Sequence, residues 1–122
     1  MAPTDSEGPT GPYRLLTVNN APARAKVLIG RVVNDLQDRY IIEHVGNCTS
    51  KDELEPMLTE LRPDILCCAS MWTPAESSEM QEKARSILPG IKTHAIPQGL
   101  QVNQGPDAIV AHLKEQFPIL LG

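Results

Sequence analysis

Amide and hydroxyl side chains, rather than acids and bases, follow the apolar segments of this chain. Asn19 and Asn20 come directly after one apolar run, Ser70 follows another, and Gln98 follows a third. Asn and Gln offer paired hydrogen-bond donors and acceptors, which suit the recognition of a neutral polar ligand. The residues predicted to bind a ligand are Asn19, Asn20, Ser70, Met71, Trp72, Thr73, Gln98 and Gly99.

Trp72 is the only tryptophan of the sequence, and it adds a stacking surface to this polar set. Thr73 and Pro74 open a predicted helix, whose free N-terminal amides could hold an anion. The same residues also allow a purely structural interpretation. Consecutive asparagines are ordinary turn chemistry, Thr73 is a helix cap, and Trp72 covers the end of a sheet or packs in a dimer.

Two residues are candidates for catalysis. His94, near the end of the predicted fourth strand, is the candidate general acid or base, because histidine titrates near neutral pH. Cys48, after the second strand, is the candidate reactive thiol. The adjacent Cys67 and Cys68 point to opposite faces of a strand and cannot chelate one metal. We therefore predict no metal site and no cofactor.

Four short segments rich in apolar and β-branched residues predict strands at 14–18, 40–45, 65–69 and 91–96. Residues 100–102 are a candidate fifth strand. Helical patterns fill the intervals, with capping boxes predicted at Ser50–Glu53 and Thr73–Glu76. Gly30 interrupts the first helical stripe, and since glycine weakens a helix, we expect close packing there.

Strands that alternate with helices pair in parallel. The third strand is wholly apolar and the first nearly so, whereas the second and fourth carry polar residues, as edge strands do. We therefore predict an α/β fold of the flavodoxin-like type, an open and mainly parallel sheet of 4–5 strands in the order 2-1-3-4 with helices on both faces. Ligands bind such sheets beyond the carboxyl ends of the strands, where the strand order reverses. That rule brings the predicted ligand-binding residues to one rim.

Composition limits the class of protein. Residues 1–12 hold three prolines and two glycines and predict a disordered tail, followed by a single domain over 13–122. The net charge of −4 and the scattered basic residues argue against nucleic acid binding. No apolar run approaches the roughly 20 residues of a membrane span. Three cysteines, an odd number, suggest free thiols and a cytoplasmic location.

The layout over residues 13–98 resembles the receiver (CheY-like) domains of response regulators. The resemblance is carried by the Asn-Asn pair after the first strand and by residues 63–66 (Pro-Asp-Ile-Leu) ahead of residues 71–74 (Met-Trp-Thr-Pro). Receivers place an acidic pair after the first strand, a phosphorylated Asp after the third and a Lys after the fifth. Here those positions hold Asn19, Asn20 and Ala69, without the Lys. The resemblance implies a degenerate receiver that lacks Mg²⁺ and phosphoryl chemistry. The layout is also similar to cobalamin-binding domains, but the DxHxxG motif is missing.

The sequence therefore predicts a non-enzymatic module that binds a small polar molecule or a protein partner at the rim, as a degenerate receiver. One alternative is a small cytoplasmic enzyme that uses His94 or Cys48 together with Asn19, Ser70 or Gln98. Another is a structural homodimer formed through the edge of the fourth strand or through an Ile/Val face.

Overall fold

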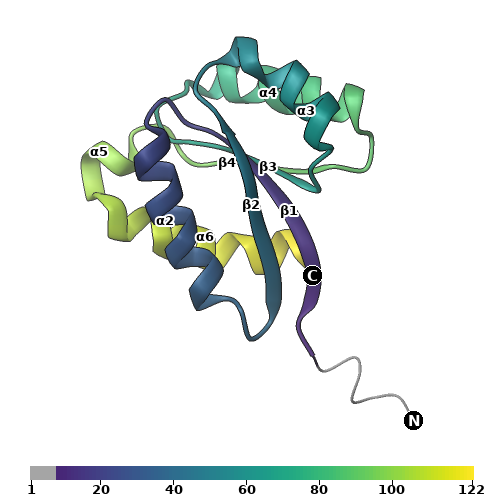
Figure 1. Cartoon of the computed structure of the whole chain (residues 1–122). Coiled ribbons are helices and arrows are strands. Elements are labelled where there is room, and N and C mark those ends of the chain that lie inside the picture. Colours follow the sequence, from purple (N-terminus) through teal and green to yellow (C-terminus); the bar gives the residue numbers. More distant parts are fainter. Residues whose placement is uncertain (1–7) are drawn as a thin grey trace.

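The computed structural model describes residues 8–122 and contains a parallel sheet of four strands in the order β2-β1-β3-β4 (Figure 1). Its strands are β1 (Thr10–Val18), β2 (Tyr40–Cys48), β3 (Ile65–Cys68) and β4 (Lys92–Ala95). All four residues of β3 are buried, whereas β4 has none buried. The predicted strand order is confirmed. The polarity of each strand was a reliable guide because central strands are covered on both faces, whereas edge strands are partly open to solvent.

Helices cover both faces of this sheet. They are α2 (Pro22–Asp35), α3 (Leu54–Leu61) with a short 3₁₀ lead-in η1 (Lys51–Glu53), α4 (Pro74–Ile87), α5 (Leu100–Gln104) and α6 (Pro106–Leu121). Figure 1 shows α2 and α6 on one face of the sheet, and α3 and α4 on the other. The chain thus has the predicted flavodoxin-like α/β fold.

The alternation of side chains along the strands divides the core into two layers. Leu15 and Cys67 pack under α2 and α6, and their neighbours Leu16 and Cys68 pack under α3 and α4. The two adjacent cysteines therefore point to opposite faces, as predicted. Both thiols are buried, and burial raises the pKa of each.

The predicted fifth strand is wrong, because residues 100–102 begin α5. Gly99 has a φ of 86°, which turns the chain away from the sheet. The Asn103 amide then donates to the Gly99 carbonyl at 2.8 Å and closes a helical turn. Among residues 8–122 the sheet ends at β4, which has a free edge.

One predicted capping box forms and the other does not. The Thr73 hydroxyl accepts from the Glu76 amide, and the Glu76 carboxylate accepts from the Thr73 amide. Ser50 makes no such bond, because the Glu53 carboxylate accepts instead from the amide and hydroxyl of Thr49, at 2.6 and 2.9 Å.

The boundaries of several elements differ from those predicted. Of the predicted tail 1–12, residues 1–7 lie outside the described residues, and residues 10–12 belong to β1, where Thr10 pairs with Tyr40. The close packing expected at Gly30 is also absent, since a Cβ placed there would meet no described atom within 4 Å. Within the described part of the chain, no helix is both long and apolar enough to cross a membrane.

Candidate functional site

The asparagine that follows β1 forms hydrogen bonds within its own turn. Asn19 is 8% exposed, and its Oδ1 accepts from the Ala21 amide at 2.8 Å. Its carbonyl accepts from Nδ2 of Asn47 at 2.9 Å, and Oδ1 of Asn47 accepts from the Thr17 hydroxyl at 2.7 Å. These amides join the ends of β1 and β2 and start α2. Asn20, by contrast, is exposed to solvent.

The polar groups after β3 hold the loop between β4 and α5. The Ser70 carbonyl accepts from the Gly99 amide at 2.9 Å, and its hydroxyl accepts from the Gln101 amide at 3.4 Å. Two small hollows remain near this end of the sheet. One, of about 20 Å³, lies between Asn19, Ser70 and Met71, and the other, of about 30 Å³, borders Asn19 within the core layer under α2 and α6. Each holds roughly one water, whereas small-molecule pockets measure roughly 300–1,000 Å³. The place between β1 and β3 where the strand order reverses, which we call the switch point, therefore has no room for a metabolite.

Trp72 lies beside the switch point and forms one wall of an open groove. Its indole Nε1 donates to the Val18 carbonyl at 2.9 Å, which fixes the ring against the end of β1. The groove has a volume of about 220 Å³, and we call it the Trp72 groove. It is lined by Trp72, Pro74, Ser77, Gln81, Ala95, Ile96, Pro97 and Gln98. None of these eight side chains is charged.

The lining of the Trp72 groove thus includes two of the predicted residues, Trp72 and Gln98, whereas Asn19 and Ser70 border the small hollow beside it. Thr73 serves as the helix cap. Sequence reasoning missed Ser77 and Gln81. The signal for them was their spacing, since positions three and seven after Pro74 lie on the same helical face as Pro74.

The Trp72 groove continues along the free edge of β4. The amides of Lys92 and Ile96 donate inward, to the carbonyls of Asp64 just before β3 and of Cys68 at its end. Because alternate residues of a strand point opposite ways, the backbone groups of Thr93 and Ala95 face the open side of the sheet. The Thr93 hydroxyl donates to Oε1 of Gln81 and accepts from Nη1 of Arg85, both at 2.9 Å.

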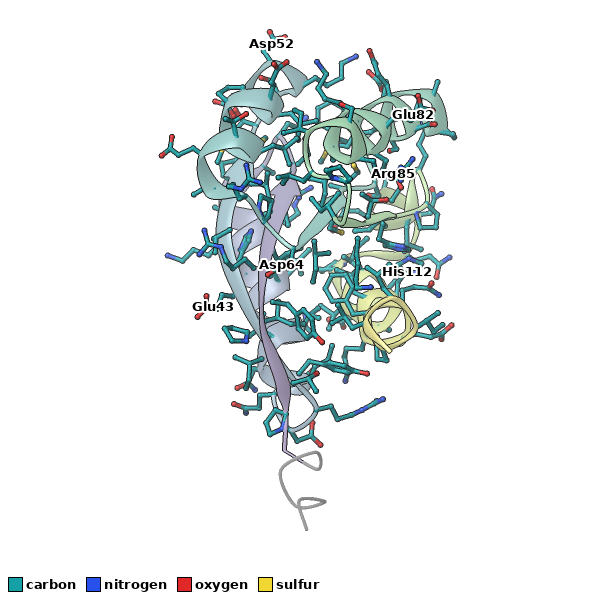
Figure 2. The ribbon with its side chains drawn as sticks, turned by 90° about the vertical axis from the view of Figure 1, so that its right-hand side faces the viewer. Glu43, Asp52, Asp64, Glu82, Arg85 and His112 are labelled. Carbon is teal, nitrogen blue, oxygen red and sulfur yellow. The ribbon has the colours of Figure 1, made fainter. Side chains whose placement is uncertain are left out.

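Two cations lie along this free edge. Arg85 projects from α4 and Lys92 from β4, and neither forms an ion pair within residues 8–122. Both residues are exposed. Figure 2 shows Arg85 and His112 on the same side of the molecule. Within residues 8–122, the β4 edge therefore combines outward backbone groups that pair with no other strand and positive charge, next to the uncharged Trp72 groove.

The two catalytic candidates lie at opposite edges of the sheet. His94, on β4, faces α6, and burial together with the neighbouring His112 lowers its pKa to about 4. Cys48, on β2, is fully buried under α3, where burial and then the charge of Glu53 raise its pKa to about 12. The structure therefore assembles no site from these two side chains, and the Cys48 thiol stays protonated and inaccessible at neutral pH.

A larger groove, of about 470 Å³, lies between α2 and the β2 edge. It is lined by Pro22, Lys26, Gly30, Val33, Ile42, His44, Val45, Gly46 and Asn47, none of them predicted as site residues. The imidazole of His44 in this groove forms a hydrogen bond within the chain, because its Nε2 lies 2.8 Å from the Thr17 hydroxyl. Residues 8–122 contain no group of three His, Cys, Asp or Glu side chains placed to hold a metal.

Solved structures with this fold include two receiver domains. The receiver domain of the putative response regulator NarL from Mycobacterium tuberculosis aligns with a TM-score of 0.59 and 12% identity, over 88% of this chain and 97% of that one. The response regulator domain of CheB from Thermotoga maritima aligns with a TM-score of 0.54 and 15% identity, over 85% and 73%.

The MID domain of the QDE-2 Argonaute from N. crassa is also similar, with a TM-score of 0.55 and 12% identity over 90% of this chain and 99% of that one. At these identities the likeness shows the fold alone. No protein-family model and no curated protein sequence matches the chain. The class that the fold defines is the receiver-like α/β domain, as the sequence resemblance predicted.

Proposed function

We propose that the chain is a receiver-like protein-binding module that holds an extended, acidic segment of a partner at the Trp72 groove and the β4 edge. One observation carries the proposal: the switch point is closed by its own hydrogen bonds, while the groove beside a free strand edge stays open. In terms of the resemblance, the module is a degenerate receiver, because Asn19, Asn20 and Ala69 replace the acidic residues.

A protein partner fits this surface better than a metabolite. The groove, at about 220 Å³, is smaller than the roughly 300 Å³ at which small-molecule pockets begin. Tryptophan is among the residues that contribute most to protein interfaces, because its large ring buries apolar area at little conformational cost. The ring of Trp72 is already held by its bond to Val18, so little conformational freedom has to be lost on binding.

The free edge favours an extended segment with negative charge. An added strand would hydrogen-bond to the outward backbone groups of Thr93 and Ala95, as in β-augmentation. Arg85 and Lys92 lie along that path without ion-pair partners among the described residues. An acidic side chain of the added segment can therefore pair with a guanidinium that uses one donor on Thr93.

The larger groove beside β2 is the weaker choice. Strand β2 carries register shifts against β1 between Thr10 and Tyr13 and between Leu15 and Leu16, and such irregularities interrupt an edge that would accept a strand. Two of the polar side chains in this groove are also engaged within the chain, since both His44 and Asn47 bond to Thr17.

Titration of Trp72 fluorescence with extended peptides tests the proposal. Acidic peptides of about eight residues should bind and should raise the melting temperature, and the matching lysine-containing peptides should bind at least tenfold more weakly. Arg85→Glu should weaken binding of the acidic peptides by about tenfold, a change of about 1.4 kcal/mol. Lys26→Glu, the same charge reversal in the β2 groove, should change binding less than twofold.

Three results would overturn the proposal. One is a metabolite, nucleotide, flavin or cobalamin that raises the melting temperature and changes Trp72 fluorescence. Another is a larger effect of Lys26→Glu than of Arg85→Glu, which would place the partner at the β2 groove. The third is a stable dimer in sedimentation experiments that Arg85→Glu dissociates, which would assign the β4 edge to a second copy.

A cytoplasmic location, in keeping with three free thiols, belongs to the proposal as well.

A further inference from the structure

Two histidine side chains meet between β4 and α6, on the face of β4 opposite the Trp72 groove. Nε2 of His94 lies 2.9 Å from Nε2 of His112, with ring centroids 5.0 Å apart and ring planes 33° apart. The two rings face each other through the nitrogens that imidazole uses to bind metals. Both side chains are only half-buried, and Figure 2 shows His112 near the surface of α6.

The spacing of these nitrogens matches a metal chelate. Two histidine nitrogens that each lie about 2.0–2.1 Å from one metal are about 2.9 Å apart at a ligand angle of 90° and about 3.3 Å apart at 109°. The observed 2.9 Å equals the separation of neighbouring positions in a square or octahedral site, and a small tilt of the two hydrogen-bonded rings, whose centroids lie 5.0 Å apart, directs both lone pairs at one metal. Cu²⁺ and Ni²⁺ prefer such sites, and Cu²⁺ binds most tightly in the series of divalent metals.

We propose that His94 and His112 form a two-histidine binding site for Cu²⁺ or Ni²⁺, with water in the remaining coordination positions. In the metal-free chain one imidazole donates its Nε2 proton to the other. On metal binding that proton moves to Nδ1 of the same ring through solvent. Both Nε2 lone pairs then bind the metal, and no net proton is released.

The surroundings keep both imidazoles in the form that binds metals. Burial is the largest cause that lowers the pKa of His94 and of His112, so both rings are neutral at pH 7. Glu115, one helical turn after His112, opposes this shift through its negative charge. The same charge favours a bound cation. Because no third ligand is placed within residues 8–122, the expected affinity is lower than that of a site with three or four protein ligands.

Metal titration of the full chain at pH 7 tests the site. Calorimetry should detect one Cu²⁺ or Ni²⁺ per chain, and the metal should raise the melting temperature. His94→Gln and His112→Gln should each weaken binding at least tenfold, since an amide keeps a hydrogen bond but binds these metals poorly. His44→Gln is the matched control, because His44 lies on β2 at the other edge of the sheet and should leave binding unchanged.

Electron paramagnetic resonance of the Cu²⁺ complex of the unaltered chain gives a readout that does not depend on whether the variants fold. Hyperfine structure from two imidazole nitrogens supports the site. A spectrum with one nitrogen or none overturns it, as does full binding by the His94→Gln/His112→Gln double variant. Ni²⁺ serves as the second probe, because it does not oxidise thiols as Cu²⁺ does.

Discussion

Replacement of two glycines by alanine should change the stability of this domain in opposite directions. Gly30 lies inside α2, and a Cβ there would meet no described atom within 4 Å. Alanine in the middle of a helix is favoured over glycine by about 0.5–1 kcal/mol, because glycine loses more conformational freedom on folding. We therefore expect Gly30→Ala to raise the free energy of unfolding by about that amount.

Gly46, on β2, is in the opposite situation. A Cβ there would lie 2.9 Å from Cδ1 of Leu61, 2.9 Å from Cε of Met57 and 3.4 Å from Cδ1 of Leu16. The atoms in the way are the ends of side chains, and that of Met57 is flexible, so the neighbours can shift. Overpacking of a core costs about 1–3 kcal/mol. We expect Gly46→Ala to cost about 1–2 kcal/mol, in the lower part of that range.

Urea unfolding followed by Trp72 fluorescence and by circular dichroism measures both effects. The two variants should differ in their free energies of unfolding by roughly 2 kcal/mol, with unchanged m-values. A loss of 1 kcal/mol or more in Gly30→Ala would refute the reasoning, since it would mean that this helix face is packed. Repeating the measurement at two protein concentrations separates a contact with a second copy from an error in the fold, because only the former depends on concentration.

The two predicted capping boxes and the half-buried His44 provide further predictions. Thr73→Ala should lower the free energy of unfolding by about 1 kcal/mol, whereas Ser50→Ala should have almost no effect, because Ser50 makes no cap bond. Urea unfolding of both variants is the measurement, and equal losses would contradict it. Burial lowers the pKa of His44 in the folded chain, so the unfolded chain takes up this proton at a higher pH than the folded chain does. The free energy of unfolding should therefore fall as the pH drops below about 6.5, the ordinary pKa of histidine. His44→Gln should reduce that fall between pH 7 and 5, and an identical pH dependence in both proteins would disprove the assignment.

The strand order was predictable because a strand buried in the middle of the sheet has apolar side chains, whereas a strand at the edge carries polar ones. The buried Ile65–Cys68 segment contains no polar residue, and the edge strand holds Lys92 and His94. The false fifth strand had no such support. Leu100 to Val102 alternate apolar and polar residues, but three residues are too few to distinguish a strand from a turn of helix. The positive φ of Gly99, the residue before α5, turns the chain so that these residues start a helix.

The candidate site was only half predictable, for a different reason. Chain order places Asn19, Ser70 and Trp72 on one rim, but it does not reveal which polar groups are already hydrogen-bonded. Asn19 and Ser70 use their side chains within the chain, and only the ring of Trp72 still borders an open groove. The pairing of His94 with His112 depends on how α6 packs across β4, which no local spacing encodes.

The residues that close the rim also determine what kind of module this can be. By the resemblance, carboxylates at positions 19, 20 and 69 would repel one another and require a cation. Asn19, Asn20 and Ala69 carry no charge, so this repulsion is absent. The amide of Asn19 can then bond to the backbone and to Asn47, which joins the ends of β1 and β2. A rim closed in this way carries no carboxylate that could be phosphorylated or bind a cation. The proposed partner binding at β4 should therefore be constitutive rather than switched from the rim.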